Sequence, residues 1–305
     1  MKVVAIAGGT GSAKLLRGLA HAVGNITVVS NVGDNFWTHG LYVCPDVDIA
    51  MYTLAGVSDR ARGWGIRGDT FNALERLKKL GEETWFQLGD QDLATHIVRT
   101  QMLKEHITLT EITAHLCGGL GVRQRILPAT NDHMETHMLT PSGEIHIQEF
   151  WVQRRGRPSL KGVRYVGAAK ARPSPEVREA IASAERVVVC PANPVTSVGP
   201  ILAISGMREL VASSSAQFVA VSPMAGARPF SGPAGKLMKA MKVRGDSVGV
   251  AKLYSDWVDT LLIHSSDVEM KASIEREGIK CRVTDTGMKT SRDEVRLARE
   301  VLESS

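Results

Sequence analysis

"KVVAIAGGTGSAKLL", from Lys2 to Leu16, is a short apolar run that ends in glycines and continues into a helical pattern. A near-continuous apolar run of this length is typical of a strand buried on both faces of a parallel sheet. Glycines between such a strand and a helix let backbone amides approach a phosphate, and the helix N-terminus adds its positive end. The stretch therefore predicts a parallel α/β sheet with an anion site at its first strand-to-helix turn.

The glycine loop matches neither of two common nucleotide-binding signatures. Ala13, Lys14 and Leu15 stand where a Walker loop requires Gly-Lys-Ser/Thr, and the dinucleotide fingerprint would need a glycine at Lys14. The alternative to a phosphate site is a glycine turn that only lets strand and helix pack closely. The candidate phosphate contacts are Gly9, Thr10, Gly11 and Lys14.

Four further runs share the pattern of the first: "ITVVS", "RVVVC", "QFVAV" and "TLLIH". Helix-like segments lie between them, at residues 12–23, 174–184, 197–212 and 232–243. This alternation predicts an α/β fold of Rossmann-like type, an open and mainly parallel sheet with helices on both faces. A terminal helix is predicted after a Ser-x-x-Glu capping box formed by Ser291 and Glu294.

The middle of the chain departs from this alternation. Residues 63–165 contain three helical stretches and then alternating, strand-like pieces such as "HMETHMLT" and "GEIHIQEFWVQRR". We interpret them as a mixed helical and β insertion packed beside the site. Residues 1–62 and 166–305 then form the Rossmann-like nucleotide-binding core.

Composition excludes several classes of protein. The 305 residues are 43% hydrophobic and 23% charged, as in a soluble globular protein, and no apolar run approaches the length of a membrane helix. The chain starts like a strand and not like a signal peptide, which favours the cytoplasm. The net charge of +5 is dispersed, so anionic small molecules fit better than nucleic acid. The four scattered cysteines favour buried thiols over a zinc site or disulfides.

Open α/β sheets bind ligands at the carboxyl ends of their strands. Each predicted core strand ends in small or polar residues, so these ends are expected to converge on one edge and to form a site. The five ends are Gly8–Gly11, Asn31–Asp34, Pro191–Ser197, Pro223–Gly226 and Ser265–Asp267.

An acidic stretch follows the second strand. Asp34 lies at the strand tip, and Asp46 and Asp48 follow a Cys-Pro pair. Acids beside a phosphate site repel the ligand unless a cation lies between them, so the three aspartates are candidate Mg²⁺ ligands. One of them could instead accept a proton from an attacking hydroxyl. The alternative is that two of the acids cap turns and only one is functional.

Two loops complete the predicted site, and one tempting signal is rejected. Repeated prolines make residues 190–202 a rigid ligand loop that presents Asn193 and Ser197, and residues 222–238 offer a second anion cradle with Arg228 and Lys236. His133 and His137 lie in a strand-like piece, where they are expected to be exposed and not to bind metal. No G-x-S-x-G elbow supports a hydrolase.

Seven blocks in the right order resemble the 2-phospho-L-lactate transferase (CofD) family of coenzyme F420 biosynthesis. The resemblance covers almost the whole chain. The blocks are "GGTGSAKLL", "NVGDN-W-HGL-VCPD-D---YTL-G", "WGIRGDT", "LGDQDLATH--RT--L", "LP-TND---T", "PANPVTSVGPIL" and "SPMAGARPFSGPAGKLM".

The resemblance implies a Mg²⁺-dependent transferase. A phospholactyl, phosphoenolpyruvyl or phosphoglyceryl group would pass from its guanosine diphosphate adduct to the ribityl hydroxyl of the deazaflavin Fo, with release of GMP. Asp34 and Asp48 would be catalytic, and Asp46 would share the metal. A homodimer is also expected. The further residues implied in ligand binding are Asn31, Trp37, His39, Trp64, Asn193, Ser197, Met224 and Arg228.

Asn35 departs from the family pattern, which usually shows two adjacent acids at this point. If the second acid is essential in the family, its role must fall here on Asp34, Asp46 or Asp48. A related family of gluconeogenesis factors supplies an alternative, a regulatory protein that binds nucleotide-sugars without catalysis. An NAD(P)-dependent oxidoreductase is disfavoured by the broken fingerprint.

Overall fold

The computed structural model describes residues 1–226, 228–230 and 232–304. Its centre is a seven-stranded sheet in which every neighbouring pair is parallel. The predicted fold class is thereby confirmed. The strands, in sheet order, are β14 (Lys280–Thr284), β13 (Thr260–His264), β10 (Gln217–Val221), β9 (Arg186–Val189), β1 (Val3–Ala7), β2 (Ile26–Ser30) and β5 (Arg125–Pro128).

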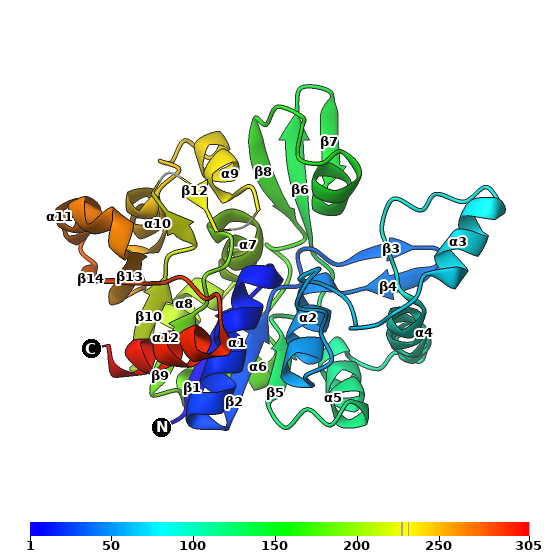
Figure 1. Ribbon diagram of the computed structural model, residues 1–305, viewed down its shortest axis with the longest axis horizontal. Helices are drawn as coiled ribbons and strands as arrows, with labels where there is room; N and C mark the ends of the chain where they lie inside the picture. The colour runs from blue at the N-terminus through cyan, green and yellow to red at the C-terminus, as the bar shows by residue number, and fades with distance from the viewer. Residues whose placement is uncertain (227, 231, 305) are drawn as a thin grey trace.

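Helices cover both faces of this sheet (Figure 1). The helices α1 (Gly9–Val23), α2 (Pro45–Leu54) and α12 (Ser291–Glu303) lie together on one face, and α6 (Pro175–Ala182), α7 (Gly199–Ala203) and α8 (Met207–Ala212) lie on the other. Every residue of β1 and β9 is buried, which explains why β1 is continuously apolar and why β9 is apolar after Arg186.

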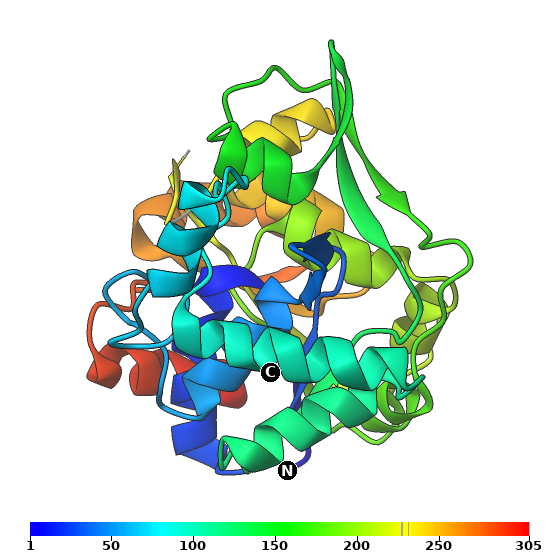
Figure 2. The ribbon, with the colours of Figure 1, turned by 90° about the vertical axis from the view of Figure 1, so that its right-hand side faces the viewer.

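The middle segment contributes three helices and a second sheet. The helices are α3 (Asn72–Lys79), α4 (Asp90–Lys104) and α5 (Leu109–Gly119), and α4 and α5 lie side by side in Figure 2. The strands β6 (Glu135–Thr140), β7 (Gly143–His146) and β8 (Gly162–Val166) form an antiparallel sheet in the order β7-β6-β8, which rises away from the core.

The predicted division into core and insertion needs one correction. Strand β5 lies within residues 63–165, yet it pairs with β2 and completes the central sheet. Its four residues, "RILP", are too few to show a strand period, and an arginine and a proline bound them. The insertion is therefore interrupted by a strand of the core.

A second correction concerns residues 197–212, which were expected to form one helix. The structure has a π-helical turn at Pro194–Val198, then α7, then α8, with Gly206 in the left-handed region at φ 85° between the two helices. The remaining elements are β3 (Phe36–Thr38), β4 (Leu41–Val43), β11 (Met224–Ala225), β12 (Arg228–Pro229), α9 (Ala234–Ala240), α10 (Ser247–Tyr254), α11 (Lys271–Glu275), a π-helical turn at Glu149–Gln153 and a 3₁₀ turn at Ser265–Met270.

The four cysteines are buried and unpaired, as predicted. Within the described residues, no helix combines the length and the apolar character needed to cross a bilayer.

The terminal helix α12 begins one residue earlier than the sequence pattern suggested. Thr290 is its N-cap, because the Thr290 hydroxyl accepts the Asp293 N–H at 3.3 Å and the Asp293 carboxylate accepts the Thr290 N–H at 2.7 Å. Two overlapping pairs fit the capping box, and the predicted one is wrong. Glu294 instead pairs with Arg17 of α1 at 2.6 Å.

Replacement of the observed cap tests this assignment. We expect Thr290→Ala to lower the free energy of unfolding by about 1 kcal/mol, because one orphan amide of the first turn loses its acceptor. Ser291→Ala is the matched control and should change the free energy of unfolding by only about 0.3 kcal/mol. Urea titration measures both, and a larger loss for Ser291→Ala would restore the original assignment.

Candidate functional site

The carboxyl ends of β1, β2 and β9 meet at the point where the order of the strands in the sheet reverses. β1 leads to β2 on one side, whereas β9, on the other side of β1, leads to β10 farther out. A crevice at such a point is where open α/β sheets bind their ligands. The glycine loop, residues 31–34 and residues 191–197 all begin at these three ends.

Two glycines let these segments approach one another. A Cβ atom on Gly11 would lie 2.3 Å from the Pro191 carbonyl oxygen. A Cβ atom on Gly8 would lie 2.7 Å from both the Asp46 carboxylate and the Ser197 Cβ. No larger residue fits at either position, so the loop brings the end of β1 directly against Asp46 and Ser197.

Asn31 organises the site through its side-chain amide. The Nδ2 group donates to Asp34 Oδ1 at 3.0 Å, to Asp46 Oδ2 at 2.8 Å and to the Thr196 carbonyl at 3.1 Å. Its Oδ1 atom accepts the Gly33 N–H at 2.8 Å. Asn31 is fully buried, so it fixes two carboxylates and the 191–197 segment in one arrangement.

Asp46 reaches the glycine loop because helix α2 begins beside it. Pro45 occupies the first turn, where its missing N–H costs nothing, and Asp46 follows. The Asp46 carboxylate accepts the Gly9 N–H at 2.7 Å. Asp46 therefore connects the N-terminal ends of α1 and α2.

The two carboxyl groups are poorly solvated. Burial raises the pKa of Asp46 to about 6, although hydrogen bonds from Asn31 and Gly9 oppose this. Burial, and then the charge of Asp46, raise the pKa of Asp34 well above its ordinary value. A divalent cation would relieve both effects, and paired carboxylates beside a phosphate site are the donors Mg²⁺ prefers. The residues present fit such an ion.

Asp48 does not join this pair. The Arg99 guanidinium on α4 donates to both Asp48 carboxylate oxygens, with Nη1 lying 3.1 Å from Oδ2. Across the described residues, no three His, Cys, Asp or Glu side chains are grouped so that they could hold a metal. The predicted trio of Asp34, Asp46 and Asp48 is therefore not assembled, and the first two remain. Asn35 is also buried and adds no charge.

The predicted aromatic and histidine contacts lie on two separate segments. Trp37 is exposed on β3 and packs against Tyr42, with ring centroids 5.0 Å apart. His39 occupies the β3–β4 hairpin turn with a positive φ of 49°. Trp64 lies under the Arg62 guanidinium, and a Cβ on the neighbouring Gly63 would lie 3.8 Å from the Thr10 methyl group. The Trp64 segment is thus beside the glycine loop.

Other predicted ligand residues already have partners in the protein. The Lys14 ammonium donates to the Met288 carbonyl at 2.9 Å. The Asn193 side chain caps its own turn by accepting the Val195 and Thr196 N–H groups at 3.0 and 3.3 Å. These contacts give both side chains a structural role as well.

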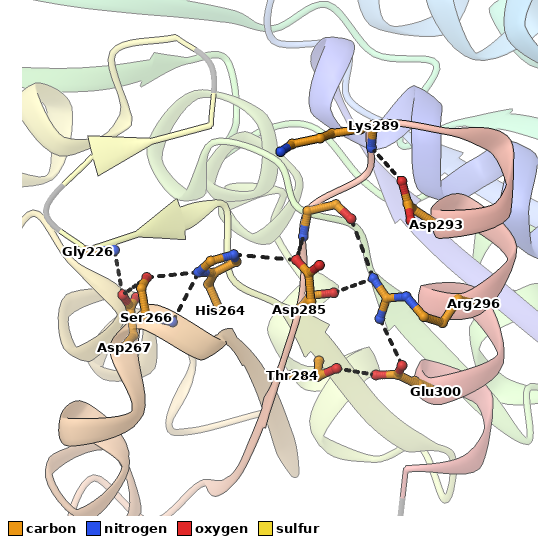
Figure 3. A network of polar contacts seen from close by, with 11 residues as sticks. Gly226, His264, Ser266, Asp267, Thr284, Asp285, Lys289, Asp293, Arg296 and Glu300 are labelled. Carbon is orange, nitrogen blue, oxygen red and sulfur yellow. Dashed lines mark hydrogen bonds and ion pairs between the residues drawn. The ribbon is translucent and has the colours of Figure 1, made fainter.

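The loop that carries Met224 and Arg228 is hydrogen-bonded to the segment that follows β13 (Figure 3). The Asp267 carboxylate accepts the Gly226 N–H, and Ser266 links Asp267 to His264. Met224 is buried and Arg228 is exposed.

Two site neighbours carried no signal in the sequence. The Tyr165 hydroxyl, on β8, donates to the Val195 carbonyl, and burial followed by the charge of Asp34 raises its pKa. The Gln148 amide donates to the Asp34 carbonyl at 3.4 Å. Both residues belong to the insertion, so the insertion contacts the site directly. His133 is exposed as predicted, whereas His137 is half-buried between Glu135 and Glu144.

Comparison with known families covers nearly the whole chain. A family model described as 2-phospho-L-lactate transferase CofD matches residues 3–301. A 2-phospho-L-lactate transferase from Methanosarcina mazei is 39% identical over 99% of this chain and 100% of that protein. A phosphoenolpyruvate transferase from Streptomyces griseus is 41% identical over 99% of this chain and 98% of that protein.

A solved structure shares the fold. It is a member of the UPF0052 family from Bacillus halodurans, 18% identical, with a TM-score of 0.67 over 99% of this chain and 98% of that one. At this identity the likeness concerns the architecture alone.

The raised pKa values of the Asp34 and Asp46 carboxyl groups predict how stability depends on pH. A carboxyl whose pKa is raised in the folded state contributes its full stability below about pH 4, and loses it as pH rises through the folded value. Asp34→Asn keeps the acceptor for Asn31 and removes one charge. In metal-free buffer at pH 8 we expect this variant to melt about 2 °C or more above the wild type, with the gap closing at pH 4.

Thermal scans with added Mg²⁺ complete the test. The ion should raise the melting temperature of the wild type at pH 8 more than that of Asp34→Asn. A variant that melts below the wild type at pH 8 would contradict the repulsion between the two carboxyl groups.

Proposed function

The chain belongs to the 2-phospho-L-lactate transferase (CofD) family, and from this premise we propose that Asp34 and Asp46 hold a Mg²⁺ ion at the phosphates of a guanosine diphosphate-linked three-carbon acid. The observation that carries the proposal is the carboxylate pair bridged by Asn31 at the glycine loop, in which Asp46 is buried and Asp34 is half-buried. The transferase activity itself follows from the family and from the near full-length relatives.

The reaction joins the ribityl hydroxyl of the deazaflavin Fo to the phosphorus that carries the acid. A new P–O bond forms with the hydroxyl oxygen, and the bond between this phosphorus and the oxygen of GMP breaks. GMP leaves with the bridging oxygen and its electron pair. The hydroxyl proton passes to a base, and the product is a phosphodiester.

The protein's share of this reaction is positioning and charge stabilisation. The amides of the glycine loop and the N-terminal end of α1 would hold phosphate oxygens. The bound cation would neutralise the charge of the diphosphate. Asp34 uses one carboxylate oxygen to accept from Asn31, and its other oxygen is the candidate to receive the proton from the hydroxyl.

The acceptor and the donor contact different loops in this proposal. Trp64, which lies beside the glycine loop, and Trp37 are the candidate stacking surfaces for the deazaflavin. Residues 193–197 and 224–228 would take the nucleotide and acid portions of the donor. Relatives named for phospholactate and for phosphoenolpyruvate are almost equally similar, at 39% and 41% identity, so three donors are candidates, the glycerate adduct included.

We propose that the enzyme is a homodimer, because the family resemblance implies it. Sedimentation of the purified protein tests the dimer.

The direct test is a mass-spectrometric assay with Mg²⁺, Fo and the guanosine diphosphate adducts of lactate, enolpyruvate and glycerate in separate tubes. We expect a phosphodiester of Fo and an equal amount of GMP with at least one donor. A folded protein that gives no product in any tube, yet binds nucleotide-sugars, would favour the regulatory alternative.

Substitutions test whether Asp34 and Asp46 are required because of their place in the site, and not only because each is an acid. Asp46→Ala and Asp34→Ala should each lower the turnover number at least about a hundredfold, because each removes charge stabilisation at the transferred phosphate. Asp256→Ala is the matched control, since Asp256 is an exposed carboxylate that pairs with Arg208 on the surface. An unchanged turnover number in the Asp46→Ala variant would contradict the proposed role of Asp46 in metal binding.

A further inference from the structure

Helix α4 carries a row of buried polar side chains that the reaction above does not use. Asp92, His96 and Arg99 follow one another at intervals of four and three residues, so they share one face of the helix. All three are buried, and Arg99 has no exposed surface. Charged side chains are rarely buried to this degree without a partner, and their partners lie on α2.

Helix α2 presents matching groups one turn apart. Arg99 donates to both carboxylate oxygens of Asp48, and the Tyr52 hydroxyl donates to Asp92 at 2.5 Å. Asp48 and Tyr52 are four residues apart and therefore face the same way. Figure 2 shows α4 lying in front of α2, across the helix that it anchors.

The chain that enters α2 is anchored to the same helix. The Tyr42 N–H, on β4, donates to the Thr100 hydroxyl at 2.8 Å, and the Tyr42 carbonyl accepts from Arg99 at 3.4 Å. Strand β4 ends at Val43 and α2 begins at Pro45. Arg99 therefore holds the start of α2 from both sides of the junction.

Asp46 lies on the opposite side of the same turn. Two residues advance a helix by about 200°, so Asp46 faces away from Asp48. It reaches Gly9 and Asn31, whereas Asp48 reaches Arg99. Any shift of this turn at the Arg99 clamp would move the Asp46 carboxylate by a similar distance.

We propose that Arg99 is a positioning residue for the transfer, which through its ion pair with Asp48 holds Asp46 at the glycine loop. The inference rests on the role proposed above for Asp46. A buried ion pair is a costly way to join two helices, and apolar side chains would join them as stably. A guanidinium that donates to both oxygens of a carboxylate, however, allows only one relative orientation of the two groups. The contact between Arg99 and Asp48 therefore fixes the position of the first turn of α2.

Charge adds a second reason. The first turn of α2 carries two carboxylates, Asp46 and Asp48. Arg99 neutralises Asp48, so Asp46 alone directs its charge to the phosphate site.

The test compares the buried Arg99–Asp48 pair with a half-buried pair of the same two-pronged kind. Arg17 on α1 also donates to both oxygens of its partner, Glu294, at 3.0 and 2.6 Å, and it contacts neither Asp46 nor Asp48. Arg99→Met and Arg17→Met are thus matched losses of a pair. We expect Arg99→Met to lower kcat tenfold or more, about a hundredfold at most, and to raise the half-saturating Mg²⁺ concentration about tenfold.

Arg17→Met should lower the melting temperature and leave the half-saturating Mg²⁺ concentration unchanged. Arg99→Lys, which keeps the charge but loses the second prong, should fall between wild type and Arg99→Met. Because the pair acts as a unit, adding Asp48→Asn to Arg99→Met should not lower kcat further. Assays are run at a temperature where circular dichroism shows each variant folded.

Unchanged kcat and Mg²⁺ dependence in folded Arg99→Met would overturn the proposal, and so would an equal effect of Arg17→Met. If Arg99→Met does not fold, Arg99→Lys and Asp48→Asn decide by the same two readouts. If the wild type turned over without Mg²⁺, the proposed metal site would be overturned instead. The role of Arg99 would then be decided by comparing the kcat of Arg99→Met with that of Arg17→Met.

Discussion

The side-chain amide of Asn31 is the contact on which the site depends. It is buried at the end of β2 and joins two carboxylates and the loop after β9. Two acids this close repel each other in a dry environment, and the neutral donor between them opposes the rise in pKa that burial causes in both. Replacing that amide would leave three segments of the chain without a common partner.

The acidic pair also explains why a helix must begin where it does. Asp46 belongs to the first turn of α2, which touches the glycine loop on one side and the buried polar face of α4 on the other. A loop could present the same carboxylate, but its position would vary. The polar contacts of α4 turn a local feature, the start of one helix, into a fixed element of the site.

The sequence predicted the parallel sheet because its central strands are buried on both faces and are therefore mainly apolar. It predicted the glycine loop because close backbone approach excludes other residues. It did not separate Asp46 from Asp48, because both follow the same Cys-Pro pair and are equally acidic. Pro45 followed by two acids is a helix-start pattern, and within a helix those acids diverge. Strand β5 and the contact of Tyr165 depend on tertiary packing alone.

Helix α12 closes over α1, and the Glu294 carbonyl approaches Gly18 so closely that a Cβ atom there would lie 2.1 Å away. The Arg17–Glu294 pair spans 277 positions of the chain. Contacts between such distant segments form late, because the cost of closing the intervening chain must be met first. The helix that begins at the glycine loop thus gains its contact with α2 from nearby sequence, and its contact with α12 only once a distant segment has been brought to it.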